Sequence, residues 1–220
     1  MRKIRKRSEP KDSGLAEWRK TPGAKWDGGQ LSDTGREALR SDQSGLCAYC
    51  MTPIQQVKVE HFIPRHHGVQ VHFDWNNLLA VCQGDAGPPN DDSRFHCDAR
   101  RGNLAKADQD LPLNPIEHPN IATVFKYTSS GEIGPANTTN ADKVQEMISK
   151  LNLQAGRFLK DNRAAAYRAA QEQVRQLNGV TAGKIHALLA LARSPNANGS
   201  ITAFAGVVEY YLEKKLRQKL

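Results

Sequence analysis

The chain has 220 residues and a formal net charge of +8, with 39% hydrophobic and 6% aromatic residues. This length accommodates one ordinary domain or a small domain with a helical extension, and the scarcity of aromatic residues disfavours a large β-rich core. The sequence has no run of 18 apolar residues and no apolar segment after its charged start, so we expect neither a membrane span nor a secretory signal. We therefore expect a cytoplasmic protein, whose positive charge favours a polyanionic partner.

The first part of the chain is predicted to be a basic arm followed by a helix. Five basic residues fall within the first seven positions: Arg2, Lys3, Arg5, Lys6 and Arg7. The rest of residues 1–30 is polar and glycine-containing, which predicts loop, and Ser32 is a candidate cap for the next helix. We assign residues 1–44 to this arm and helix, and we expect the arm to be unpacked in the isolated chain.

The remaining chain divides into three predicted segments. Residues 45–105 carry all the cysteines, with a hairpin expected from Ile54 to Phe62, the segment LLAV as strand or helix, and a loop over residues 84–95. Residues 106–139 form a connector and a second hairpin, with IATVFKY as its first strand and a return strand at Ile133. From residue 140 to 220 the pattern is helical, with helices expected near residues 141–153, 155–177, 182–192 and from 201 onward. The expected class is α+β.

The cysteine pattern predicts a structural metal site. Cys47 and Cys50 form a CxxC turn, which places two thiolates at adjacent corners of a tetrahedral ion. Cys82 and Cys97 follow at a wider spacing and complete a set of four. Four cysteines in a cytosolic chain are more typical of zinc ligands than of disulfides. A thiol redox protein is disfavoured because no βαβ pattern surrounds the CxxC.

The segment VEHFIPRHHG, which follows the CxxC turn, carries a carboxylate and an imidazole side by side. In a strand, Glu60 and His61 point to opposite faces, so one can bind a metal while the other reaches a substrate. Phosphodiester hydrolysis needs an activated water and a cation that neutralises the developing charge. This pair is therefore a candidate for that chemistry.

In combination, the motifs CAYC, EHFIP, NNLLAVC and CDARRGN resemble the pattern of HNH endonucleases. More narrowly, the chain resembles the PtuB-like proteins found with Septu defence systems and some retrons, because RKRSEP, LAEWRK, LPLNP and KLNLQAGRFLKDNR match segments outside the HNH motifs. The resemblance covers most of residues 1–165. It implies a zinc-stapled ββα-metal nuclease core, a nucleic acid substrate with DNA favoured and RNA as the alternative, a role in antiphage defence, and a PtuA-like ATPase partner.

The resemblance also implies roles for individual residues. His61 matches the general base, Asn77 matches the residue that orients the histidine or stiffens the hairpin, and Glu60 and Asp98 match the ligands of a catalytic Mg²⁺ or Mn²⁺ ion. Arg101 stands where the family has lysine, and a guanidinium suits contact with a phosphate. The zinc positions fall on the four cysteines: Cys47, Cys50, Cys82 and Cys97.

Three alternatives stay open at the level of sequence. His96 stands beside Cys97 and is an alternative zinc ligand, and Asn76 is an alternative to Asn77 as the middle residue of the motif. The other histidines, His66 and His67 least securely, are interpreted as surface or packing residues. The main rival function is a zinc-ribbon module that binds nucleic acid or a partner without cleaving it. A pure binding module has no need of Glu60, His61 and Asp98 at nuclease spacing.

Overall fold

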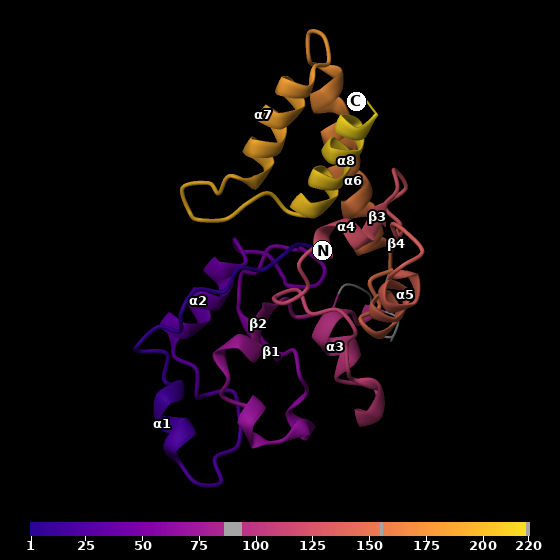
Figure 1. Cartoon of the computed structure of the whole chain (residues 1–220). Coiled ribbons are helices and arrows are strands. Elements are labelled where there is room, and N and C mark those ends of the chain that lie inside the picture. The colour runs from indigo at the N-terminus through magenta and orange to yellow at the C-terminus, as the bar shows by residue number, and fades with distance from the viewer. Residues whose placement is uncertain (86–93, 155, 219–220) are drawn as a thin grey trace.

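The computed structural model describes residues 1–85, 94–154 and 156–218 of the chain. Figure 1 shows helices at one end, short strands and helices at the other, and the remaining elements between them. The helical end comprises α6 (Gly156–Arg175), α7 (Ala182–Arg193) and α8 (Ala205–Arg217). The opposite end comprises α1 (Leu15–Lys20), α2 (Asp33–Asp42), β1 (Lys58–His61) and β2 (Leu78–Val81). In Figure 1 α3 (Cys97–Arg101) stands at the level of β1, and nearer the helical end are α4 (Ile121–Val124), β3 (Phe125–Tyr127), β4 (Ile133–Pro135) and α5 (Ala141–Lys150). This mixture of helices with two small sheets agrees with the expected α+β class.

Helix α2 begins where its capping residue predicts. The hydroxyl oxygen of Ser32 accepts a hydrogen bond from the backbone N–H of Gly35 at 3.1 Å, which satisfies one of the N–H groups left free in the first turn. Leu39 faces inward and is fully buried. The predicted position of this helix is therefore confirmed.

Strand β1 does not form the hairpin expected between Ile54 and Phe62, and that prediction is wrong. It pairs antiparallel with β2, so that Glu60 lies opposite Leu79 and His61 opposite Leu78. The chain between the strands forms three short 3-10 turns instead: η1 (Arg65–His67), η2 (Val69–Val71) and η3 (Trp75–Asn77). All four residues of β2 are buried, which explains why LLAV lacks the alternation of a half-exposed strand.

The N-terminal arm is packed into the protein, which corrects the expectation that it is unpacked. Met1 and Ile4 are almost completely buried, and the backbone N–H of Ile4 donates to the carbonyl of Pro115 at 2.9 Å. Arg2 forms a 2.8 Å ion pair with Glu209 of α8. The high charge of the arm suggested that solvent surrounds it. Instead, Met1 and Ile4 are buried, and backbone carbonyls of other segments accept hydrogen bonds from the arm, which lies between the two ends of the molecule.

The second predicted hairpin is correct only in its second half. IATV forms α4, and the sheet consists of β3 paired with β4, with Tyr127 opposite Ile133. In the connecting turn Gly131 has a φ of +84°, and a side chain there would collide with the carbonyl oxygen of Lys160 in α6. The buried guanidinium of Arg163 donates to the carbonyl of Gly131 at 2.7 Å. The turn is thereby fixed against α6.

The four helices predicted after residue 140 are present as α5 to α8, although α8 begins at Ala205 rather than near Ile201. In α5 the side chains of Val144, Met147 and Ile148 are buried on one face, in agreement with the helical spacing of apolar residues. None of the helices in the described ranges is both long and apolar enough to cross a bilayer. The expected loop over 84–95 falls largely on residues 86–93, which lie outside the described residues.

One buried amide connects α2 to β2 and gives a test of this packing. The side chain of Gln43 donates to the carbonyls of Leu46 at 2.8 Å and Ala80 at 2.6 Å, and it accepts from the N–H of Ala80 at 2.9 Å. Gln43→Ala should lower the free energy of unfolding by about 2–4 kcal/mol, because buried backbone groups lose their partner. Urea denaturation measures this change.

The matched control is Gln176→Ala, which removes an amide from an exposed position in the chain. It should change the free energy of unfolding by less than about 0.5 kcal/mol. Equal stability of the two variants would contradict the role assigned to Gln43.

Candidate metal centre and active site

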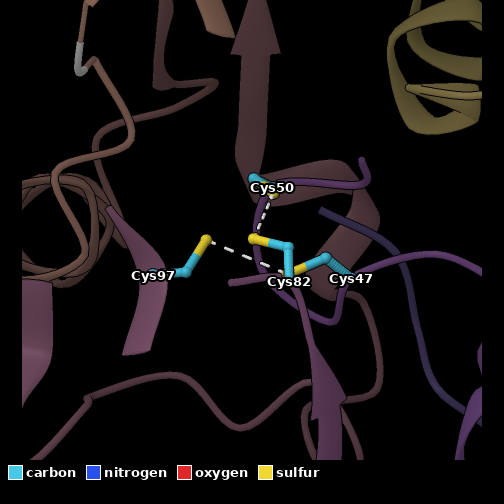
Figure 2. Close-up of side chains that lie close together, drawn as sticks. All are labelled: Cys47, Cys50, Cys82 and Cys97. Carbon is cyan, nitrogen blue, oxygen red and sulfur yellow. Dashed lines mark hydrogen bonds between the residues drawn. The ribbon is translucent and has the colours of Figure 1, made fainter. Parts of the chain in front are cut away.

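The four cysteines converge from separate segments into one buried cluster. Cys47 and Cys50 lie in the turn after α2, Cys82 directly follows β2, and Cys97 begins α3. Figure 2 shows their side chains turned toward one another. The four sulfur atoms all lie within 4.8 Å of one another, with 3.6 Å between Cys50 and Cys82 and 3.9 Å between Cys47 and Cys97. A tetrahedral zinc with Zn–S bonds of about 2.3 Å separates its sulfurs by about 3.8 Å, so the cluster has the dimensions of such a site.

The chemistry of the cluster also fits a metal rather than disulfides. All four cysteines are free, and the sulfur distances above are far longer than the roughly 2.05 Å of a disulfide bond. Burial raises the pKa of Cys47 and Cys97 well above that of an ordinary thiol. A cation that coordinates the sulfurs reverses this effect and stabilises the thiolates. The four cysteines are therefore positioned to bind a metal ion.

His96 lies beside the cysteine cluster and does not replace one of its members. Its Nδ1 is 3.2 Å from the sulfur of Cys97 and 3.9 Å from that of Cys82. Among the described residues, the group of mutually close ligand atoms contains the four cysteines but not His96. The imidazole is thus placed to hydrogen-bond the sulfurs, in the manner of groups that orient metal ligands.

Glu60 and Asp98 are brought together between β1 and α3. Burial raises the pKa of Glu60 to about 8, and the nearby charge of Asp98 adds to this effect. Burial opposes the ionisation of Asp98 as well, but hydrogen bonds from Glu60 and Lys58 lower its pKa. These opposite shifts describe two carboxyl groups that share one proton.

Both carboxyl groups also have basic partners from the chain itself. Arg101 donates to Glu60 in a buried ion pair, and Lys58 lies 2.7 Å from Asp98. The hydroxyl of Tyr49, which lies between the CxxC cysteines, donates to Glu60 at 3.4 Å. The Lys58 and Asp98 side chains are partly exposed, so this half of the cluster is open to solvent.

His61 is held in one tautomer by a backbone carbonyl. Its Nε2 lies 2.9 Å from the carbonyl oxygen of His72, which can only accept, so Nε2 carries the proton and Nδ1 is the acceptor nitrogen of the ring. The edge of the ring packs against Trp26 with 4.7 Å between centroids. Burial lowers the pKa of His61 to about 4, so the imidazole is neutral near pH 7 and able to accept a proton.

Asn77 fixes the chain that follows β1. Its side-chain oxygen accepts from the N–H of Ile63 at 2.6 Å, and its amide donates to the carbonyls of Ile63 at 3.0 Å and Val71 at 2.9 Å. Asn77 is buried, whereas Asn76 is exposed. Between the two candidates for the middle motif residue, the geometry favours Asn77.

Arg101 lies in the interior of the protein, whereas the sequence predicted that it contacts a phosphate of the substrate. It is 3% exposed, and its guanidinium donates to the carbonyls of Phe62 and Gln109, both at 2.6 Å, in addition to Glu60. With these donors engaged, Arg101 fastens α3 to the end of β1. A phosphate contact at Arg101 stays a prediction that this geometry does not favour.

A cavity of about 670 Å³ opens one side-chain layer away from His61. The ring of Phe73, in its wall, lies 6.0 Å from those of Trp26 and His72, the two neighbours of His61. Its wall also carries aromatic and basic side chains: Lys6, Arg7, Trp18, Arg19 and Trp75. Aromatic faces combined with positive charge are typical of surfaces that bind nucleotides.

Several residues around the site were not identified from the sequence. Tyr49 stands inside the CxxC motif, and its position between two metal ligands is a signal of burial beside them. Trp26 and His72 approach His61 from segments 35 residues before and 11 residues after it. No spacing rule connects such positions: η1 and η2 set the approach of His72, and the chain from Trp26 reaches His61 by way of α2.

Comparison with known proteins supports the HNH resemblance at a coarse level. No family model matches the chain. An Escherichia coli protein named "Retron Ec83 putative HNH endonuclease" is 28% identical over 200 residues, covering 72% of this chain and 76% of that protein. The chain is thus similar to a retron-associated HNH protein. The narrower resemblance to PtuB-like proteins of Septu systems stays a prediction.

The cysteine cluster predicts about one tightly bound zinc ion per chain. Cys50→Ser should remove most of this zinc and reduce the yield of folded protein, because the remaining three sulfurs leave the ion incompletely coordinated. Elemental analysis of protein purified without chelator measures the metal.

Ser13→Ala is a suitable control, since it also removes a buried polar side-chain atom but lies outside the cluster. It should leave the zinc content at about one per chain. Wild-type protein that contains no zinc would refute the metal assignment.

Proposed function

We propose that the chain is a metal-dependent HNH nuclease that hydrolyses phosphodiesters of nucleic acid. The observation that carries the proposal is the fixed tautomer of His61: its Nε2 is bonded to a backbone carbonyl, Nδ1 is the acceptor nitrogen of a buried, neutral imidazole, and the charge of Asp98 acts on the ring. The name of the similar retron-associated protein supports the same activity. DNA is the favoured substrate, and RNA is the alternative.

The proposed roles follow from the positions of the side chains. His61 Nδ1 takes a proton from the attacking water while its Nε2–H stays bonded to the carbonyl of His72. Glu60 and Asp98 are the proposed ligands of Mg²⁺ or Mn²⁺, whose oxygen preference they satisfy. The bound cation supplies charge stabilisation to the phosphate and to the leaving oxygen. Asn77 keeps the segment after β1 in register.

The carboxyl groups of Glu60 and Asp98 can bind a divalent cation together if one of their basic partners, Lys58 or Arg101, moves away. Burial raises the pKa of Glu60, and the neighbouring charge of Asp98 adds to the effect, so a cation placed between the two carboxyl groups would favour the ionised form of both. Lys58 is the partner that can move, because its side chain is 38% exposed, whereas Arg101 is enclosed. Lys58 then becomes available to a substrate phosphate at the same edge of the sheet.

The positive charge of the chain is consistent with this substrate. A net charge of +8 attracts a polyanion, and the cavity lined by Phe73, one side-chain layer from His61, offers Arg7 and Trp18 to a nucleotide. These features apply equally to a module that binds nucleic acid without cutting it. The pairing of both carboxylates with basic side chains favours that second candidate, so cleavage itself must decide between the two.

His61→Ala should reduce cleavage by a factor of about 10² to 10⁴, because the proton acceptor is lost while the proposed metal ligands remain. Nucleic acid affinity should be retained. In-gel cleavage of DNA and RNA substrates with and without Mg²⁺, together with a binding assay, measures both quantities.

His118→Ala provides a control, since His118 lies outside the site and its change should leave the cleavage rate unaltered. Cleavage by His61→Ala at the wild-type rate would end the nuclease assignment at this residue. If wild-type protein binds but does not cut any substrate with Mg²⁺ or Mn²⁺, the binding module is the better description.

We further propose, from the resemblance to PtuB-like proteins and from the retron-associated relative, that the chain acts in antiphage defence with a PtuA-like ATPase. The helical end offers a contact surface: Leu191 is 66% exposed and lines an apolar groove of about 390 Å³ between α6, α7 and α8. Because the N-terminal arm is packed, this groove is a more suitable contact surface than the arm.

Leu191→Asp should reduce co-purification with a co-expressed PtuA-like ATPase by at least about tenfold, because a charge is costly in an apolar contact. His186→Asp introduces the same charge at an exposed position of the same helix and should have little effect. Unchanged co-purification of Leu191→Asp would exclude the groove as the contact.

A further inference from the structure

A second group of potential metal ligands lies outside the carboxyl pair and the cysteine cluster. It consists of His66 and His67, in η1, and Asp110, which lies 43 residues beyond His67 in the chain. One ligand atom from each residue lies within 4.8 Å of the other two. The Nε2 of His67 is 2.8 Å from a carboxylate oxygen of Asp110, and the two imidazole rings stack with 4.6 Å between their centroids. Three exposed side chains therefore present two nitrogens and one oxygen to a common point.

The turn that carries the two histidines is held in place before any ligand binds. The backbone N–H of His67 donates to the carbonyl of Pro64 at 3.0 Å, and the ring of His72 donates to the carbonyl of Arg65 at 2.9 Å. Asn77 holds the chain just before the turn through its two hydrogen bonds to Ile63. A ligand at this site therefore orders only side chains, which lowers the entropic cost of binding.

The surroundings of Asp110 leave its carboxylate available. Lys150 donates to the backbone carbonyl of Asp110 at 2.7 Å, not to its carboxylate, and forms a 2.7 Å ion pair with Glu146. Its charge is thus already compensated. The neighbouring carbonyl of Gln109 accepts from Arg101 at 2.6 Å, so Asp110 lies directly beside an anchored residue.

We propose that His66, His67 and Asp110 bind a divalent transition metal ion such as Zn²⁺, with water at the remaining coordination positions. Two imidazole nitrogens and one carboxylate oxygen suit ions of intermediate softness and disfavour Mg²⁺ and Ca²⁺. With bonds of about 2.0–2.1 Å, ligand atoms of a tetrahedral site lie about 3.3 Å apart. The Nε2 of His67 and the Asp110 oxygen, now 2.8 Å apart, therefore have to separate by about 0.5 Å, and the remaining ligand atoms start within 4.8 Å. The exposure of all three residues means that the ion is exchangeable, unlike one in the buried cysteine cluster.

The position of this site gives the ion a structural effect. η1 begins four residues after His61, and Asp110 follows the residue that receives a hydrogen bond from Arg101 of α3. An ion held by both segments links the chain after β1 to the chain after α3. Occupancy therefore stiffens the frame around Glu60 and His61, and this link is independent of whether the chain is a nuclease.

The test uses protein that retains its cysteine-bound metal. This protein is titrated with Co²⁺ and, separately, with Zn²⁺, and isothermal calorimetry measures the binding. Wild-type protein should bind one ion beyond the cysteine-bound metal, and the added Co²⁺ should show absorption without the strong bands of sulfur ligation. His67→Gln and Asp110→Asn should each weaken this binding at least about tenfold, because one of three protein ligands is lost. His186→Gln, which alters an exposed histidine elsewhere, should bind like the wild type.

A second measurement separates binding from any change in folding. Added Zn²⁺ should raise the Tm of wild-type protein and of His186→Gln, but not of His66→Gln, since an ion bound to the folded state stabilises it. Absence of a second ion in the wild type would overturn the proposal and leave His67 and Asp110 as a surface ion pair. The proposal would also be overturned if His186→Gln lost as much affinity for the ion as His67→Gln, because binding would then not depend on the three proposed ligands.

Discussion

The four clustered sulfur atoms determine how the strands and helix of the candidate site are arranged. Cys82 directly follows β2 and Cys97 begins α3, so their approach to Cys47 and Cys50 brings α3 against the sheet. With only four residues in each strand, β1 and β2 offer few hydrogen bonds of their own. A marginal two-stranded sheet of this kind needs an additional constraint, and a cross-link between its end and the following helix supplies it.

The buried guanidinium of Arg101 depends on that constraint in turn. It lies one helical turn beyond Cys97, which directs its side chain under β1 toward Glu60 and the carbonyl of Phe62. A buried charge of this kind is costly unless it is hydrogen-bonded, and here each of the three guanidinium nitrogens donates to at least one acceptor. The same residue that keeps α3 in place therefore also limits the charge of the carboxyl pair. The position of α3 and the ionisation of Glu60 therefore both depend on the side chain of Arg101.

The sequence predicted which residues gather at the candidate site better than it predicted how their side chains contact one another. Helices α2 and α5 to α7 could be located because caps and apolar spacing are local signals, and the CxxC motif indicated the metal cluster. The partner of β1 could not be found this way, because β2 lies 16 residues further on and the turns between them show no periodic pattern. The role of Arg101 was also hidden, since charge alone does not show whether a guanidinium faces solvent or acceptors inside the protein. The packing of the N-terminal arm was hidden for a similar reason, because its five basic residues outnumber Met1 and Ile4, the two apolar residues that are buried.

The packed arm has a consequence for how the protein is assembled during synthesis. Arg2 and Ile4 are made early, yet their partners, Glu209 and Pro115, are made more than 200 and more than 100 residues later. Arg2 therefore lacks its partner until α8 has left the ribosome, whereas Ile4 can pair once Pro115 has been made. Contacts that span so much of the chain form late and slow the final step of folding. The ion pair between Arg2 and Glu209 therefore joins the N-terminal arm to the helical end only after α8 has been made.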